Sequence, residues 1–442
     1  MVLRRSGRPV AGADSPDRDP MSDDAPMTDP GLALTPDRFA WALGIEDTFI
    51  PQLAPGGRVL DEYVLTQHDR FWRDDLRRIA DTGCRHLRYG IPWYRVNPAP
   101  GVFDWSWTDQ VLPYLVQDLG IAPILDLVHY GAPLWLDGTF LAPDYPMRVA
   151  EYAAAVARRY GTLVRSWTPL NEPILHAHRA GRTGAWPPHR RGERGYAAVA
   201  FSLAEGIANT IDAIRAESTG ARIVHVEAVS SYVVADPSLE DAAIIPRAMP
   251  HLVADLVQGR LTASHALHPW LLDRGVAGSR IEALEGSGRV IDVWGVNWYP
   301  QFSHYRVEGT PGATRVRKVA GSRHDLADLL RDVHRRSGVP VMVTETSVHG
   351  RVHQRLPWVA ELERMAHELR LEGLPLVGIT WFPAFSLVGW DYRRGRRPAE
   401  AYLTHFGLWD LRPEPDGSLR RDRTPVADAF EAVVRTADRQ PA

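Results

Sequence analysis

The chain has 442 residues, 45% of them hydrophobic and 24% charged, which is typical of a soluble globular protein with a sizeable core. Its formal net charge of −3 gives no reason to expect nucleic acid or a membrane surface as a partner. Cys84 is the only cysteine, so no disulfide can form within the chain. We expect Cys84 to be a buried core thiol, and we expect a reducing, cytoplasmic location.

The N-terminal residues 1–35 are rich in Asp, Pro, Arg, Ser and Gly and are predicted to be a disordered tail. No apolar run follows Arg4 and Arg5, so this tail does not resemble a secretory signal peptide. Further along, no stretch is expected to reach the roughly 20 apolar residues of a membrane helix. Residues 36–442 are predicted to form one domain.

Short apolar runs alternate with amphipathic helical stretches from Phe39 onward. The apolar runs are 39–46, 85–93, 121–129, 163–172, 222–230, 290–299, 340–346 and 376–384. Stretches such as 71–80, 146–160 and 325–337 have apolar residues on one helical face and end at a glycine. Eight continuously apolar strands alternating with helices predict a parallel (β/α)₈ TIM barrel. The doubly wound alternative is disfavoured, because residues 42–46 contain only one glycine and no dinucleotide fingerprint.

Polar side chains gather where these strands should end. Such a set is costly in a core and reasonable in a pocket, and barrel enzymes place their chemistry at the carboxyl ends of the strands. In strand order the candidates are Glu46, Arg88, His129, Tyr130, Asn171, Glu172, Asn297, Tyr299, Glu345 and Trp381.

Glu172 and Glu345 follow the fourth and seventh strands, and across a barrel mouth the two carboxyls can flank one bond. A carboxyl pair of this kind suits glycoside hydrolysis. Desolvation would keep Glu172 protonated as the acid, whereas Arg88 and the Tyr299 hydroxyl would keep Glu345 ionised. Asn171 is then placed to bind the 2-hydroxyl of a sugar.

These residues together resemble clan A of the glycoside hydrolases, and within it glycoside hydrolase family 1. The resemblance rests on Arg88, His129, Thr168-Pro169-Leu170-Asn171-Glu172-Pro173, Asn297-Trp298-Tyr299, Thr344-Glu345, Trp381 and Phe406-Gly407-Leu408. It implies a retaining mechanism with Glu172 as acid/base and Glu345 as nucleophile, about 5–5.5 Å apart. It also implies that no metal or organic cofactor takes part.

The chain departs from the family where the sugar is recognised. Residues 345–347 read Glu-Thr-Ser instead of Glu-Asn-Gly, and Tyr130 stands where the family has Trp. Glu46 is the candidate for the family's first-strand Gln, while Trp390 and Asp391 come two residues later than the family's Glu-Trp pair. The expected partner is therefore a small-molecule β-glycoside or oligosaccharide, and the sequence does not identify its sugar. The alternatives are a transglycosidase acting on a small-molecule acceptor and a sugar-binding barrel that has lost catalysis.

Several positions admit a purely structural interpretation. His129 is a sugar-hydroxyl ligand or a core histidine, and Trp381 is a sugar platform or plain packing. The loop 176–196 carries five arginines and three histidines, which suits either a clamp for an acidic glycoside or a solvated, flexible lid. Because no carboxylate or thiol cluster joins these histidines, the loop is not predicted to bind a metal.

Overall fold

The computed structural model of the protein describes residues 34–53 and 57–437. The tail predicted for residues 1–35 falls almost wholly outside this range. Leu34 is only 1% exposed and Thr35 pairs with Arg38 in an isolated bridge, so the ordered fold already includes the last two residues assigned to the tail.

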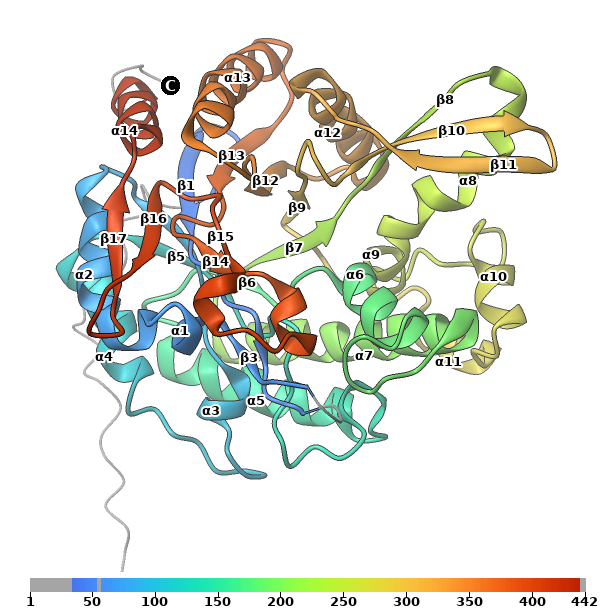
Figure 1. Cartoon of the computed structure of the whole chain (residues 1–442). Coiled ribbons are helices and arrows are strands. Elements are labelled where there is room, and N and C mark those ends of the chain that lie inside the picture. Colours follow the sequence, from blue (N-terminus) through green and yellow to red (C-terminus); the bar gives the residue numbers. More distant parts are fainter. Residues whose placement is uncertain (1–33, 54–56, 438–442) are drawn as a thin grey trace, which may run out of the picture.

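Eight parallel strands close into a barrel in the order β1-β13-β12-β9-β7-β6-β5-β4, which confirms the predicted (β/α)₈ fold (Figure 1). Every one of the eight predicted runs contains one of these strands. Their bounds are β1 Ala40–Gly44, β4 His86–Gly90, β5 Ala122–Asp126, β6 Ser166–Thr168, β7 Arg222–Ala228, β9 Val293–Asn297, β12 Val341–Thr346 and β13 Leu376–Trp381. Closure occurs where β1 pairs in parallel with both β4 and β13.

Small and branched apolar side chains form a cluster from the barrel strands. Ala40, Ile124, Val224, Val293 and Met342 belong to it, and Leu34 joins them. Buried residues on both faces explain why these strands are apolar without alternation. The polar residues follow or end the strands, so the packed cluster supports the site without containing it.

Helices surround the barrel, and the three amphipathic stretches singled out in the sequence are among them. The longer helices are α2 His68–Asp81, α5 Tyr145–Tyr160, α7 Gly192–Glu217, α12 Arg323–Ser337, α13 Val352–Leu371 and α14 Pro425–Ala437. The shorter ones are α1 Glu62–Leu65, α3 Trp93–Val96, α4 Thr108–Pro113, α6 Pro173–Ala177, α8 Glu240–Ala248, α9 Leu252–Val257, α10 His268–Asp273 and α11 Gly278–Leu284. Cys84 is buried just before β4, as expected of a core thiol.

Helix α7 corrects one expectation, because its length and hydropathy reach those of a membrane-spanning helix. Its apolar window is 72% buried inside the protein, and the helix packs extensively against α5. The apolar composition is therefore explained by burial between the barrel and its neighbouring helices.

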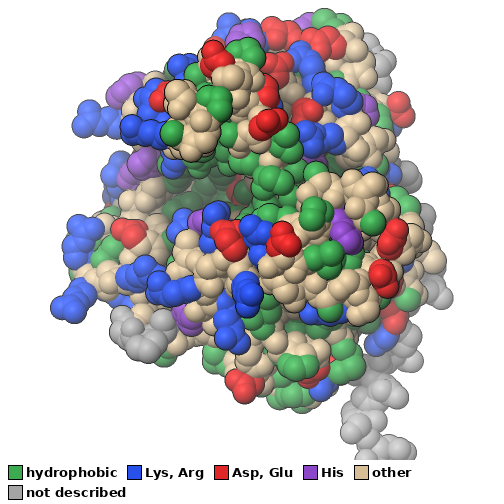
Figure 2. All heavy atoms as spheres, turned by 90° about the vertical axis from the view of Figure 1, so that its right-hand side faces the viewer, with side chains coloured by type: hydrophobic (Ala, Val, Ile, Leu, Met, Phe, Trp, Pro, Cys, Tyr) green, Lys and Arg blue, Asp and Glu red, His purple; other side chains and the backbone are tan. Residues whose placement is uncertain are grey.

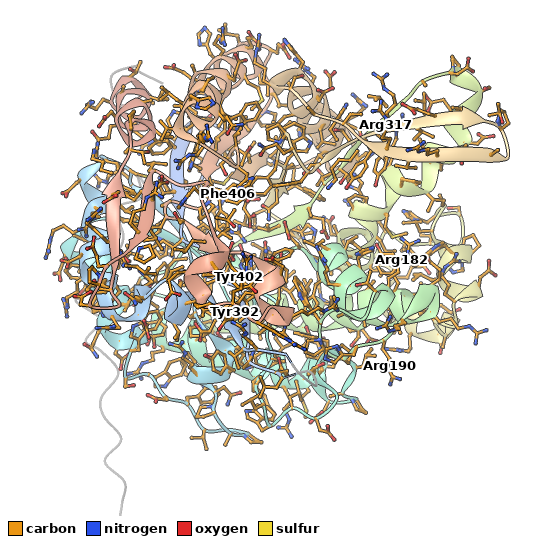
Figure 3. All side chains as sticks on the ribbon, viewed as in Figure 1. Arg182, Arg190, Arg317, Tyr392, Tyr402 and Phe406 are labelled. Carbon is orange, nitrogen blue, oxygen red and sulfur yellow. The ribbon has the colours of Figure 1, made fainter. Side chains whose placement is uncertain are left out.

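Small sheets decorate the barrel. Strands β8 Ser231–Val234, β10 His304–Thr310 and β11 Ala313–Lys318 form a three-stranded arm that projects to one side (Figure 1). The pairs are β2 Phe49–Ile50 with β3 Leu60–Asp61, β14 Leu387–Val388 with β15 Leu403–Thr404, and β16 Trp409–Pro413 with β17 Leu419–Arg423. Short turns of helix η7 Trp390–Arg394 and η8 Ala399–Tyr402 lie between β14 and β15, with Tyr392 and Tyr402 in ring contact (Figure 3).

Candidate active site

The segment after β6 carries Asn171 and Glu172 in a turn, where the sequence predicted a continuous strand. β6 ends at Thr168, and Pro169 has no N–H with which to continue the ladder. The backbone N–H of Asn171 donates to the Val128 carbonyl at 2.9 Å, and that of Glu172 donates to the Val226 carbonyl at 3.1 Å. Neighbouring segments on both sides thus hold the turn, and Glu172 adopts a left-handed conformation with φ of 47°.

Two neutral donors bind the carboxyl group of Glu172. The Tyr130 hydroxyl donates to Oε2, and Asn297 Nδ2 donates to Oε1 at 2.9 Å. Burial and, after it, the negative charge of Glu345 raise the pKa of Glu172 to about 7, against the lowering effect of these hydrogen bonds. A carboxyl with such a pKa can hold a proton near neutral pH and release it when a leaving group needs it.

Glu345 lies near the end of β12 and faces different partners. Arg88, from β4, donates to its Oε1 in an ion pair, and the Tyr299 hydroxyl donates to its Oε2 at 2.8 Å. Burial and the charge of Glu345 raise the pKa of Tyr299 well above its ordinary value, so this phenol remains a donor. Both oxygens of Glu345 accept hydrogen bonds, as an ionised nucleophile requires.

A continuous hydrogen-bond path joins the two glutamates, although β7 and β9 separate their strands in the barrel. Arg88, which holds Glu345, also donates to Asn171 Oδ1 at 2.6 Å. Asn297, which holds Glu172, donates to the same oxygen at 3.1 Å. The path shows that the two carboxyls belong to one site, and the separation of about 5–5.5 Å remains a prediction.

Asp126, which the sequence reasoning passed over, supports Arg88 from below. It ends β5 and is fully buried, and its Oδ2 lies 2.6 Å from Arg88 Nη2. Burial opposes its ionisation, but the positive charge of Arg88 outweighs burial and lowers the pKa of Asp126. A charged residue inside the apolar run 121–129 was the signal that could have revealed it.

His129 is engaged by protein groups on both ring nitrogens. The acceptor role of Asn171 Oδ1 leaves Asn171 Nδ2 as a donor to His129 Nε2 at 2.8 Å. The ring proton then sits on Nδ1, which lies 2.6 Å from Asp47 Oδ1. Among the described residues His129 therefore orients Asn171, and its role as a sugar-hydroxyl ligand stays a prediction.

Glu46, Asp47 and His129 bring ligand-type atoms within 4.8 Å of one another, which raises the question of a metal. His129 has no lone pair to spare, because Nε2 accepts from Asn171 and Nδ1 carries the proton that faces Asp47.

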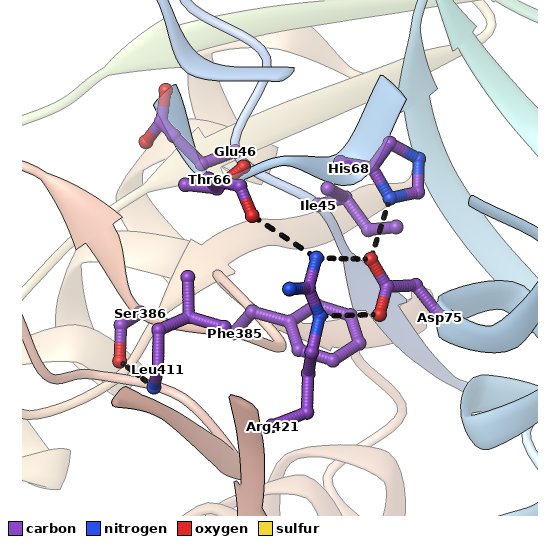
Figure 4. Close-up of a pocket in the computed structure, with 9 residues that line it drawn as sticks. All are labelled: Ile45, Glu46, Thr66, His68, Asp75, Phe385, Ser386, Leu411 and Arg421. Atoms are coloured by element: carbon purple, nitrogen blue, oxygen red, sulfur yellow. Dashed lines mark hydrogen bonds and ion pairs between the residues drawn. The ribbon is translucent and has the colours of Figure 1, made fainter. Parts of the chain in front are cut away.

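Glu46 stands in the pocket region with one oxygen engaged. Thr48 donates to Glu46 Oε1 from its backbone N–H at 3.1 Å and from its hydroxyl at 2.6 Å. Burial raises the pKa of Glu46 to about 7. Its carboxyl points away from a small adjoining pocket, in which Arg421 of β17 pairs with Asp75 (Figure 4).

Glu62, a second carboxyl missed in the sequence, is fully buried, and its Oε2 accepts from the Val388 N–H at 3.0 Å.

The aromatic and acidic candidates after β13 divide into three cases. Trp381 is only 1% exposed, and its indole N–H donates to the Phe406 carbonyl at 3.1 Å. Trp390 is half-buried and its ring centroid lies 5.8 Å from that of Tyr130, close to the acid/base candidate. Asp391 is exposed on η7, away from the buried network. Trp390, unlike Asp391, therefore lies beside the Tyr130 ring that contacts Glu172.

The loop 176–196 is more buried than a solvated lid would be. His176, Trp186 and Tyr196 are each at most 5% exposed. His176 and Trp186 pack against the Tyr130 ring at centroid distances of 5.7 and 4.6 Å. This aromatic packing makes the first half of the loop a wall of the site. The arginine-rich composition of the loop did not predict it.

Glu227 at the end of β7 anchors the turn that presents Glu172. Its carboxyl is fully buried and accepts from the Ile174 N–H at 3.1 Å and from the Ala228 N–H at 2.9 Å. Ile174 lies two residues after Glu172, so Glu227 holds the backbone that follows the acid/base candidate.

Replacing Glu227 with alanine is expected to destabilise the protein by about 1–3 kcal/mol, because the buried N–H of Ile174 and the partly buried N–H of Ala228 lose their acceptor. Urea unfolding followed by circular dichroism measures this loss, and turnover of an alkyl glycoside measures the effect on Glu172. Glu205→Ala, at a partly exposed glutamate on α7, is a control. An unchanged unfolding midpoint would show that Glu227 does not anchor the turn.

A parallel barrel that carries a carboxyl of raised pKa beside an arginine-paired one has the arrangement of a barrel glycoside hydrolase. The sequence profile of glycosyl hydrolase family 1 matches residues 47–252. The chain is therefore similar to this family over just under half of its length, with low identity to its curated relatives.

Curated relatives are similar in sequence, and solved structures share the fold. The thermostable β-glucosidase B of Thermobispora bispora is 27% identical over 390 residues, which cover 76% of each chain. The bifunctional β-D-glucosidase/β-D-fucosidase of Bifidobacterium breve is 34% identical over 163 residues, covering 33% of this chain and 34% of that protein. A family 1 β-glucosidase structure from Thermotoga maritima has a TM-score of 0.75 at 17% identity and covers 90% of this chain and 98% of its own. The same enzyme has been solved with deoxynojirimycin, with a TM-score of 0.75 at 18% identity and the same coverage.

Proposed function

We propose that the protein hydrolyses a β-linked glycoside with retention of configuration, with Glu345 as nucleophile and Glu172 as acid/base. The observation that carries the proposal is the asymmetry of the pair. Glu172 has a raised pKa and neutral donors, whereas Glu345 lies against the Arg88 guanidinium. The names of the relatives, β-glucosidase and β-D-fucosidase, support glucosides and fucosides as the first substrates to test.

The mechanism has two displacements. A Glu345 oxygen attacks the anomeric carbon while the bond from that carbon to the leaving oxygen breaks, and the Glu172 proton moves to the leaving oxygen. Water then attacks the anomeric carbon of the glycosyl-enzyme, its proton passes to Glu172, and the Glu345 carboxylate is released. Arg88 and Tyr299 hold Glu345 in position, and Asn171 joins Arg88 to His129 and Tyr130 beside both glutamates.

A panel of 4-nitrophenyl β-glycosides (gluco, galacto, fuco, manno and 6-phospho) tests the activity and identifies the sugar. Release of nitrophenol from at least one of them is expected, with water as the main acceptor. Alkyl glycoside formation in the presence of added alcohol, at the expense of free sugar, would instead identify a transglycosidase. Binding of sugar with no turnover across the panel would favour a barrel that has lost catalysis. We also propose a cytoplasmic location, which the single buried cysteine suits.

The reaction with a poor leaving group is expected to slow as the pH rises through about 7. Glu172 must be protonated to deliver its proton, and its pKa is about 7, so kcat/KM should fall by about tenfold per pH unit above that point. The pH profile for an alkyl β-glycoside measures this limb. A 2,4-dinitrophenyl glycoside is the control, since its leaving group departs with little help from an acid. An alkyl-glycoside profile that stays flat to pH 9 would contradict the assignment.

A further inference from the structure

Arg179 occupies an unusual position at one end of the wall formed by the loop 176–196. It belongs to η4, His178–Arg182, one helical turn after the segment that carries Glu172. Its guanidinium carbon lies 5.3 Å from the ring centroid of Trp390 and 6.0 Å from that of Trp186. A cation on two indole faces is held in a defined place, which an arginine in a solvated lid would not be.

The two tryptophans connect Arg179 to the acid/base group. Their ring centroids lie 5.0 Å apart, and both pack against the ring of Tyr130. Tyr130 in turn donates its hydroxyl hydrogen bond to Glu172. Because the leaving oxygen takes its proton from Glu172, the departing group lies on this aromatic side of the site. Figure 2 shows a face that is hollowed, with hydrophobic side chains within the hollow and basic ones around it.

The charge of Arg179 has no counter-ion among the described residues. Its Nε is buried without a hydrogen-bond partner, and none of its guanidinium nitrogens lies within ion-pair distance of a described carboxylate. Nearby arginines differ in this respect, since Arg182 pairs with Glu193 at 2.6 Å and Arg274 approaches the same carboxylate at 3.6 Å. Stacking on the indoles explains where Arg179 lies, but it leaves a half-buried fork of N–H donors free to bind an anion.

We propose that Arg179, Trp186 and Trp390 form an aglycone subsite for a planar aromatic leaving group that carries an anionic substituent. The half-buried Trp390 supplies flat apolar contact, with the buried Trp186 packed behind it, and the Arg179 guanidinium supplies hydrogen bonds to a carboxylate or another oxyanion at the far end of the aglycone ring. This inference rests on the proposed glycosidase function and adds the chemical class of the aglycone to it.

The test compares two aryl glycosides of the sugar that the panel selects. One carries a 4-carboxyphenyl aglycone, and the other carries the neutral 4-carbamoylphenyl aglycone of nearly the same shape. Arg179→Gln is expected to lower kcat/KM for the carboxylate by about ten- to a hundredfold, the range of a hydrogen bond to a charged group, and to leave the amide within about twofold. For the wild type, KM for the carboxylate should rise with salt, and in the variant it should not.

Arg190→Gln is the matched control, because Arg190 is exposed on the same loop and lies at its outer edge (Figure 3). Arg190→Gln should leave kcat/KM unchanged for both aryl glycosides. Arg179→Lys should recover part of the preference for the carboxylate, since the charge is kept and the planar fork is lost.

Three results would overturn the subsite. An equal loss of kcat/KM for both aglycones in Arg179→Gln would show that Arg179 has a structural role in the wall. No loss for either aglycone would show that Arg179 does not bind the aglycone. A selective loss on a 6-phosphoglycoside of a neutral phenol would place the anion on the sugar instead. If the wild type turned over neither aryl glycoside nor any member of the panel, the proposed function itself would fail, whereas normal turnover of the amide confines a failure to the subsite.

Discussion

Glu345→Gly is expected to abolish hydrolysis of 4-nitrophenyl glycosides, with a loss of at least about a thousandfold in kcat. The carboxylate that forms the glycosyl-enzyme is gone, and Arg88 and Tyr299 are left without the oxygens to which they donate. Azide should restore nitrophenol release, because a small anion fits the space of the deleted side chain and lies against the Arg88 guanidinium. Attack from that face inverts the anomeric carbon, so the product should be the α-glycosyl azide, identified by NMR.

Glu345→Gln is the comparison that makes this result specific. The amide fills the same space, cannot act as a nucleophile and leaves no room for azide, so the variant should be inactive with and without the anion. Rescue of Glu345→Gln by azide, or a β-glycosyl azide from Glu345→Gly, would show that the nucleophile lies elsewhere. Circular dichroism of both variants separates a lost nucleophile from a lost fold, since Arg88 keeps Asp126 as a buried partner in each.

The barrel was predictable because its signal is repeated along the chain. Each strand is a continuous apolar run, each of the singled-out helices has one apolar face, and the polar residues fall after the runs. β6 was the least accurate strand, since its run continues to Glu172 in sequence while pairing stops before Pro169. The proline and the left-handed Glu172 end the strand, and an apolar pattern alone does not report backbone conformation.

The site was predictable in its residue types and less so in its contacts. Strand-end position brought Glu172, Glu345, Arg88 and Tyr299 together, because strands of one barrel share a mouth. Asp126 and Glu62 were missed because they lie inside or between apolar runs, where only a closed structure shows which charge each one meets. Trp186 was missed for a different reason, since its arginine-rich surroundings read as solvated although the indole is 3% exposed.

Arg88 shows why the site tolerates so many buried charges. One guanidinium meets Asp126, Glu345 and the oxygen of Asn171, so its five donors serve three acceptors at once. Asn171 extends this network, because its amide N–H groups donate hydrogen bonds to His129 and Tyr130. Catalytic geometry therefore depends on a shared network, and changes at its members should be strongly non-additive with changes at Glu345.

Glu172→Ala is expected to separate substrates by their leaving groups. For an alkyl glycoside, kcat/KM should fall by about 10²- to 10⁴-fold, because the carboxyl that protonates the leaving oxygen is gone. For a 2,4-dinitrophenyl glycoside the first step should survive, since that phenolate departs unprotonated. The second step should be slow without a base, which predicts a burst of dinitrophenol followed by a low steady state and a reduced KM.

Azide distinguishes this role from that of Glu345 by the stereochemistry of its product. In Glu172→Ala the anion should attack the glycosyl-enzyme on the face that water normally uses, so it should give the β-glycosyl azide and raise the steady-state rate. If the roles are as assigned, azide therefore gives the α-anomer with Glu345→Gly and the β-anomer with Glu172→Ala. An equal loss on both leaving groups, or an α-azide from Glu172→Ala, would reverse or dismiss the acid/base assignment. The raised pKa of Glu172 leads us to expect the split, because a group poised near neutral pH can give a proton in one step and take it back in the next.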